Sequence, residues 1–234
     1  MQLFFNTEIN ESTKEILFNK EESRHIVRVL RKRQGDILHI TNGNGYLFDA
    51  EIIIESDKKC VAKIVKSVFK EKEWSYYLHL AIAPTKNIDR LEWFIEKATE
   101  IGIDEITPIL CDNSERKVIK HDRLQKIMLS AVKQSLKFTA PKLNELTKFS
   151  DFIAKERDGE LCIAHCNDGE KTSLKNINFS SNIITILIGP EGDFSLRETQ
   201  DALNSKYIPI SLGESRLRTE TAGLVAVHSI NFLH

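Results

Sequence analysis

The chain has 234 residues, of which 41% are hydrophobic and 29% are charged, and its formal net charge is −1. This composition is typical of a folded, soluble protein with one large or two small domains. The near-zero net charge excludes a uniformly basic nucleic-acid-binding protein, so an RNA site has to come from local clusters among the 33 Lys and Arg residues.

The sequence predicts a cytoplasmic protein without a membrane segment or a metal site. No apolar run is long enough to span a bilayer, and residues 1–20 contain no apolar core of a signal peptide. The four cysteines fit no disulfide framework of a small secreted domain, which favours reduced thiols. Cys162, His165 and Cys166 lie close in sequence, but no second ligand pair accompanies them, so buried thiols are preferred over metal ligands.

Residues 1–72 are expected to form a small β-barrel. Alternating residues from Ile37 lead into Asn-Gly-Asn-Gly at 42–45, a hairpin turn, and strands are expected over 46–54 and 61–68. One helix is expected over 21–33. It would place Arg24, Arg28 and Arg31 on one outward stripe, with His25, Lys32 and Arg33 beside it. The stripe suits a phosphate backbone, and a solvated helix face is an equally good interpretation.

From residue 73 the pattern changes to strands that alternate with helices. Strands are expected at 78–83, 105–110, 161–166, 183–188 and 208–212, and helices over 88–101 and from 122, where Asp122 would cap the helix. This alternation predicts βαβ units and a parallel sheet, so the fold class is α/β. The expected domains are 1–72 and 73–234.

Two stretches near the C-terminus carry the functional prediction. In the first, a β-branched run ends in Gly189-Pro-Glu-Gly192, and Ser195 with Glu198 forms a capping box for the next helix. In the second, a strand ends at Leu212-Gly213, and Leu217-Arg-Thr-Glu-Thr-Ala222 leads into an apolar C-terminal helix. Ligands of open α/β sheets bind where such loops lie, although an ordinary strand-turn-helix joint is also compatible with the first stretch.

Together these motifs resemble the 16S ribosomal RNA uridine-N3 methyltransferase family of the SPOUT superfamily. The resemblance extends to His25-Ile-Val-Arg-Val-Leu-Arg31, to the segment from Lys86 to Gly102, to Ser114-Glu-Arg116 and to Gln134-Ser135. It covers nearly the whole chain, with the motifs in the family's order.

The resemblance implies a PUA-like barrel for RNA, followed by a SPOUT domain with a C-terminal trefoil knot. It also implies a homodimer that binds S-adenosylmethionine and acts on 16S rRNA within the small ribosomal subunit, without any membrane partner. The implied cofactor residues are Leu187, Ile188, Gly189, Glu191, Gly192, Leu212, Gly213, Leu217, Arg218 and Thr221. The RNA-binding candidates are Arg24, His25, Arg28, Arg31, Lys32, Arg33, Arg116, Gln134 and Lys137.

Arg218 and Glu220 are the predicted catalytic residues. Arg218 would stabilise negative charge on the uracil oxygens, whereas Glu220 would accept the N3 proton, orient Arg218 or cap the helix. The chain departs from the family at Asp193, where a third glycine is usual, at Ser215-Arg216, and at Lys137, where arginine is usual. Two alternatives stay open: another SPOUT reaction, such as ribose 2′-O or transfer RNA methylation, and an RNA-binding protein without catalysis.

Overall fold

The computed structural model describes residues 1–234, which form two compact units. The first unit comprises residues 1–73 and 132–140, and the second comprises 74–131 and 141–234. Residues 132–140 therefore pack with the first unit, although the sequence predicted one continuous domain from residue 73 onward. The expected boundary after residue 72 stays a prediction.

A five-stranded sheet with the order β1-β3-β4-β5-β2 forms the first unit. Its strands are β1 (Leu3–Phe5), β2 (Glu15–Leu17), β3 (Ile37–Thr41), β4 (Tyr46–Ile54) and β5 (Val61–Phe69). The predicted hairpin turn joins β3 to β4, and Gly43 and Gly45 there have φ values of 76° and 87°, which glycine adopts without a steric cost. Phe48, Ile40 and Ile52 fill the core of this unit.

The helix predicted over 21–33 is confirmed only as far as Val29, and its second half is not α-helical. The chain forms a short helix, α1 (Lys20–Arg24), and then a π-helical turn, η1 (His25–Val29). The Leu30 amide donates to the His25 carbonyl at 2.9 Å, which is the i to i+5 spacing of a wide turn. Arg31 follows with a φ of 55°, outside the helix. Arg24, Arg28 and Arg31 consequently do not form the regular helical stripe that an α-helix would give.

The second unit contains an all-parallel sheet with the strand order β11-β13-β10-β12-β6-β7-β8, in which β9 also pairs with β7. Its strands are β6 (Tyr77–Ile82), β7 (Glu105–Leu110), β8 (Lys142–Leu143), β9 (Thr147–Lys148), β10 (Glu160–Ala164), β11 (Thr172–Ser173), β12 (Ile183–Ile188) and β13 (Ile208–Ser211). The helices are α2 (Ile88–Ile101), α3 (His121–Gln134), α4 (Phe149–Ile153), the 3-10 turn η2 (Leu174–Asn176), α5 (Leu196–Asn204) and α6 (Thr219–Leu233), and the end of α3 belongs to the first unit. The predicted α/β class with a parallel sheet is confirmed.

Local sequence chemistry explains most boundaries in this unit. Gly102 ends α2 with a φ of 132°, and the predicted capping box of Ser195 and Glu198 begins α5. The boundaries that differ most from the predictions are those of α3, which already begins at His121 so that Asp122 lies in its first turn, of α6, which begins at Thr219, and of β10, which ends at Ala164. The strands β6 and β13 each end one residue earlier than predicted. The two-residue strand β8 and the five-residue helix α4 were not predicted, because they are too short for a periodic pattern.

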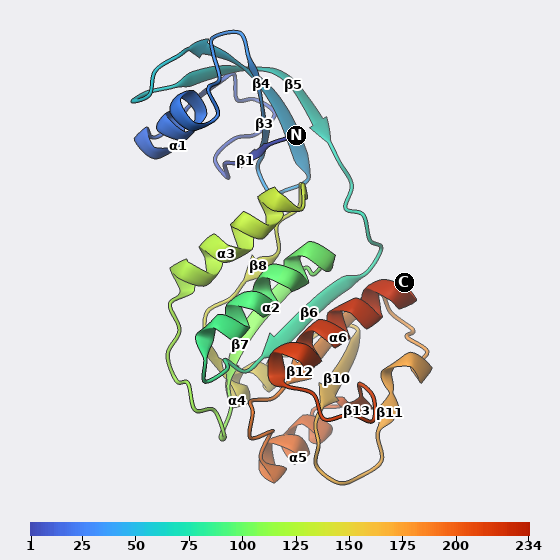
Figure 1. The fold of residues 1–234 in the computed structure, drawn as a ribbon. Coiled ribbons are helices and arrows are strands. Elements are labelled where there is room, and N and C mark those ends of the chain that lie inside the picture. The colour runs from blue at the N-terminus through green and yellow to red at the C-terminus, as the bar shows by residue number, and fades with distance from the viewer. The chain divides into compact units, whose positions relative to one another are not determined.

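Helices cover the two faces of the parallel sheet. On one face, Leu78, Leu80 and Ile82 of β6 pack in a core with residues of α2 and α6, which Figure 1 shows lying side by side. On the other face, Ala81 of β6 and Leu187 of β12 pack against residues of α4 and α5. None of the helices has the length and apolar character needed to cross a membrane.

Gly223 allows α6 to lie directly on the sheet and on α2. A Cβ atom at this position would lie 2.8 Å from the Phe94 ring and 2.9 Å from the Ile82 Cδ1 atom. We therefore expect Gly223→Ala to lower the free energy of unfolding by on the order of 1 kcal/mol, because overpacking outweighs alanine's better helix propensity. Urea unfolding measures this change. His228→Ala, at an exposed position of the same helix, is the control, and equal stability of both variants would contradict the close packing.

Candidate active site

The two glycine-containing stretches meet at the carboxyl end of the parallel sheet. Leu187 and Ile188 are buried at the end of β12, and Gly189 follows them. Thr219, the first residue of α6, donates a hydrogen bond from its hydroxyl to the Gly189 carbonyl at 3.1 Å. The structure therefore joins two segments that are 30 residues apart in sequence. Ligands of parallel α/β sheets bind at this edge.

Residues after two other strands support the first loop. The Lys86 amide, beyond the end of β6, donates to Glu191 Oε1 at 2.9 Å. Asn113, after β7, donates from Nδ2 to the carbonyls of Gly192 at 3.1 Å and Asp193 at 3.0 Å. Neither Lys86 nor Asn113 was among the predicted residues of this loop site, although both follow predicted strands at the same edge of the sheet. Their position after a strand was the one available signal.

Asp193, at the position where the resembled family usually has a third glycine, adopts a backbone conformation that glycine favours. Its φ is 62°, a left-handed conformation that glycine adopts readily and that aspartate tolerates better than most residues. Its carboxylate accepts hydrogen bonds from the amides of Cys166 at 2.7 Å and Phe194 at 2.8 Å. The side chain thus provides backbone contacts that offset the strain of its conformation.

The second loop presents a mixture of exposed and buried groups. Gly213 and Arg218 are exposed, whereas Leu212, Leu217 and Thr221 are partly buried. A Cβ atom built on Gly213 would meet no atom within 4 Å, so open space lies next to this glycine. The backbone of Arg218 caps α6, and its carbonyl accepts from the Ala222 amide at 2.7 Å.

Glu220 and Glu191 each keep one buried carboxylate oxygen without a hydrogen-bond partner. For both side chains this atom is Oε2. The Oε1 atom of Glu220 lies 3.7 Å from Arg90 Nε, so Glu220 forms its ion pair with Arg90 and not with Arg218. Buried acceptors usually have partners, so two unpaired carboxylate oxygens at this edge provide sites for a donor from a ligand.

The predicted RNA-binding residues have different environments in the first unit. Arg24 and Arg31 are exposed, and so is Gln134. Arg28 forms an ion pair with Asp57 at 2.8 Å, and Arg33 pairs with Glu55. His25 is partly buried and lies 3.1 Å from the Gln2 side chain, and Lys32 is also partly buried.

Two further RNA-binding candidates, Lys137 and Arg116, also contact other parts of the protein. Lys137 is 8% exposed and lies 3.4 Å from the Glu73 carboxylate. Arg116, in the second unit, donates to the carbonyls of Thr85 and Lys86. Arg116 therefore holds the loop whose amide binds Glu191. This contact explains its presence without any RNA.

Comparisons with known proteins agree with this arrangement. The RNA methyltransferase domain family matches residues 72–231, and the RNA methyltransferase PUA domain family matches residues 18–65. The ribosomal RNA small subunit methyltransferase E of Buchnera aphidicola subsp. Acyrthosiphon pisum is 33% identical, covering 91% of this chain and 86% of its own length. The chain belongs to the ribosomal RNA small subunit methyltransferase E family. It is therefore an RNA methyltransferase, and the predicted family is confirmed.

Solved structures of similar proteins confirm the SPOUT fold of this family member. A probable rRNA methyltransferase from Porphyromonas gingivalis has a TM-score of 0.91 and 38% identity, covering 100% of this chain and 98% of its own. The Neisseria gonorrhoeae ribosomal RNA small subunit methyltransferase E, bound to S-adenosyl methionine, has a TM-score of 0.86 and 26% identity with the same coverage.

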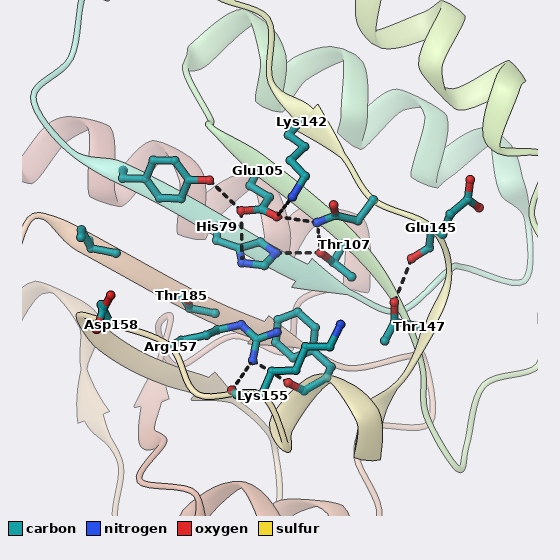
Figure 2. A pocket seen from close by; sticks show the side chains of 14 residues that line it. His79, Glu105, Thr107, Lys142, Glu145, Thr147, Lys155, Arg157, Asp158 and Thr185 are labelled. Atoms are coloured by element: carbon teal, nitrogen blue, oxygen red, sulfur yellow. Dashed lines mark hydrogen bonds and ion pairs between the residues drawn. The ribbon is translucent and has the colours of Figure 1, made fainter.

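A separate polar cavity lies at the opposite, amino-terminal end of the sheet and has a volume of about 620 Å³. Figure 2 shows His79, Glu105 and Thr107 on its floor. His79 Nε2 lies 2.7 Å from the Thr107 hydroxyl, and Glu105 accepts from Tyr77 at 2.6 Å. We call this the amino-end cavity. Its lining comprises Tyr77, His79, Glu105, Thr107, Lys142, Asn144, Glu145, Thr147, Phe152, Lys155, Arg157, Asp158, Ile183 and Thr185.

Two ionisable side chains on the cavity floor, His79 and Glu105, have pKa values that are shifted well below their usual range. Burial lowers the pKa of His79 to about 4, against the opposing influence of Glu105, so its imidazole is neutral near pH 7. Burial alone would raise the pKa of Glu105. Hydrogen bonds from Tyr77, Asn144 and Lys142, with the nearby His79, outweigh burial and lower this pKa to about 2.

The neutral His79 makes stability depend on pH. Because its pKa is about 4 when folded and 6.5 in the reference state, the unfolded chain takes up a proton first as pH falls. The contribution of the neutral His79 to the free energy of unfolding is complete above pH 6.5. It falls by roughly 3 kcal/mol as the pH is lowered to about 4. Urea unfolding over this range should show a flatter pH profile for His79→Asn than for the exposed-site control His228→Asn. Identical profiles would contradict a neutral, buried His79.

Proposed function

We propose that this protein transfers a methyl group from S-adenosylmethionine to N3 of one uridine in 16S ribosomal RNA. The observation that carries this proposal is the junction of the two loops at the carboxyl end of the sheet, made by Thr219 and Gly189. The family relationship and the solved relative bound to S-adenosyl methionine support it.

The residues at this junction fit the cofactor. The unpaired Oε2 atoms of Glu191 and Glu220 are acceptors that suit the ammonium and hydroxyl donors of the molecule. Gly189 and Gly192 leave room for the protein's own Phe194 and Asn113, which a Cβ atom would approach to 3.1 Å and 3.2 Å, whereas open space lies beside Gly213. The residues proposed to hold the cofactor are Leu187, Ile188, Gly189, Glu191, Gly192, Leu212, Gly213, Leu217, Arg218 and Thr221.

When it is bound, the cofactor supplies an electrophilic methyl group. The protein has to align the uridine N3 atom with that methyl group and exclude water, and such positioning supplies ~7–11 kcal/mol. N3 must also lose its proton. We propose that the exposed Arg218 guanidinium stabilises the charge that develops on the uracil oxygens. Glu220 is the proposed proton acceptor, and Arg90, whose Nε atom lies 3.7 Å from Glu220 Oε1, would orient this carboxylate.

Other parts of the proposal concern partners and location. Phe232 and Leu233 of α6 are 81% and 43% exposed, and Trp93 of the adjacent α2 is 43% exposed, which supports a homodimer through this helix pair. The first unit would bind RNA in the cytoplasm through Arg24, Arg31 and Gln134, with a small ribosomal subunit as the substrate. Arg28 and Arg33 would first have to exchange their carboxylate partners for phosphates.

Methyl transfer is tested with methyl-labelled S-adenosylmethionine and small ribosomal subunits that lack the modification. We expect the label in 3-methyluridine after digestion of the RNA, identified by nucleoside mass spectrometry. Label in a ribose 2′-O-methyl nucleoside, or in transfer RNA only, would replace this reaction with another SPOUT reaction. Absence of both label and cofactor binding would leave a non-catalytic RNA-binding role.

The role of Arg218 is tested by Arg218→Ala. We expect the turnover rate to fall roughly 10²–10³-fold, because a charge-stabilising donor is lost in the transition state. Single-turnover kinetics measure the rate, and calorimetry with S-adenosylmethionine checks that the cofactor still binds. Arg216→Ala, at an exposed position two residues earlier, is the matched control and should keep near-normal turnover. Equal rates for both variants would show that Arg218 has no catalytic role.

A further inference from the structure

The amino-end cavity interrupts the apolar face of the parallel sheet. On the face that packs against α4 and α5, Ala81 and Leu187 are apolar, but two residues earlier in their strands stand His79 and Thr185. Residues two apart in a strand point to the same face. The change from apolar to polar side chains therefore occurs on one face, midway along the strands, and the polar half borders the cavity.

Arg157 is held in place inside this cavity with part of its guanidinium uncommitted. Its Nη1 atom donates to the carbonyls of Phe152 and Lys155, and its Cζ atom lies 3.7 Å from the centroid of the Phe152 ring. The buried Tyr207 hydroxyl is its other neighbour, and Arg157 opposes the rise in the pKa of Tyr207 that burial causes. Arg157 forms no ion pair with a carboxylate, although it is only partly exposed.

The lining holds three cations, Lys142, Lys155 and Arg157, and three carboxylates, Glu105, Glu145 and Asp158, so its charges balance while His79 is neutral. Lys142 is paired with Glu105 at 3.1 Å, whereas Lys155 has no carboxylate partner. The other two carboxylates of the lining, those of Glu145 and Asp158, are exposed and lie toward the two ends of the view in Figure 2. A fixed guanidinium with a free lysine next to it is the arrangement that recognises carboxylate and phosphate groups.

Thr185 adds a hydroxyl on the floor of the same cavity. The residue is 2% exposed, and its hydroxyl forms no hydrogen bond within the protein. A volume of about 620 Å³ lies within the range of small-molecule sites, and Tyr77 and Ile183 add exposed apolar surface for the body of a ligand.

We propose that the amino-end cavity is a second ligand site, which binds a small organic anion through Arg157, Lys155 and Thr185. The recognised group is a carboxylate or a phosphate, and the rest of the molecule lies along Tyr77 and Ile183. This site is at the opposite end of the strands from the loops proposed for the cofactor. It therefore does not depend on the proposed methyl transfer.

The test follows the His79 ring by NMR, because this ring forms part of the cavity floor. Inorganic phosphate, citrate and uridine 5′-monophosphate are titrated separately into protein saturated with S-adenosylhomocysteine, and the His79 resonance is assigned with His79→Asn. We expect a saturable shift with at least one probe. A response to phosphate and the nucleotide identifies a phosphate ligand, a response to citrate alone identifies a carboxylate ligand, and a response to all three identifies a general anion site.

Variants connect the response to the proposed residues. Arg157→Gln and Lys155→Gln should each weaken binding, Arg157→Gln by at least roughly 10-fold, and Thr185→Val should weaken it less. Lys155 is exposed and unpaired, so Lys155→Gln keeps the test valid if Arg157→Gln does not fold. Arg197→Gln is the matched control, because Arg197 is exposed on α5 and pairs only with Asp201. Absence of a saturable shift with every probe, or a shift unchanged in Arg157→Gln, Lys155→Gln and Thr185→Val, would overturn the proposal.

Discussion

The hydrogen bond from Thr219 to the Gly189 carbonyl is the contact on which the arrangement of the active-site loops depends. It fixes the start of α6 against the end of β12, so Arg218 and Glu220 stand next to the glycine loop. Gly223, one turn further along α6, has no side chain and allows the helix to rest on Phe94 and Ile82. The positions of the proposed catalytic residues thus follow from close packing of a helix on a sheet.

The parallel sheet places different chemistry at its two ends. At the carboxyl end, backbone groups and carboxylates from loops after β6, β7 and β12 converge. At the amino end, polar side chains emerge from the strands themselves and are fixed by hydrogen bonds of His79 with Thr107 and of Glu105 with Tyr77. Loops serve the first end, whereas strands serve the second. Hydrogen bonds from Tyr77, Asn144 and Lys142 stabilise the charged form of Glu105 among these strands, and its low pKa reflects them.

Strong local patterns made much of the second unit predictable. The β-branched run at 183–188, the Gly102 stop and the capping box of Ser195 gave the strands and helices, and the glycine motifs gave the site loops. The helix expected over 21–33 ends early, at Val29, because its second half is a π turn, which leaves no trace in residue spacing. The buried hydroxyl of Ser23, which bridges the Phe18 carbonyl and the Cys60 amide, fixes the segment through tertiary contacts.

Other features could not be predicted because they depend on long-range contacts. Asn113 enters the site by bonding to residues about 80 positions later, and Arg116 reaches back to the loop after β6. The amino-end cavity was missed for a related reason. His79 and Thr185 are isolated polar residues in apolar strands. They line one cavity only because β6 and β12 are neighbours in the sheet, where these two residues lie opposite each other.

The composition of the first unit has a consequence for synthesis on the ribosome. This unit needs residues 132–140, whose backbone bonds to the hairpin turn include the Gly45 amide to the Phe138 carbonyl at 2.9 Å and the Ala140 amide to the Gly43 carbonyl at 2.8 Å. The amino-terminal sheet can thus form early, but its turn waits for a segment made about 90 residues later, after β6, α2 and β7 have emerged. All residues of the first unit are therefore made by residue 140, before β10, β12, β13 and α6 of the second unit, and a fragment that ends at residue 73 leaves that turn without its partners.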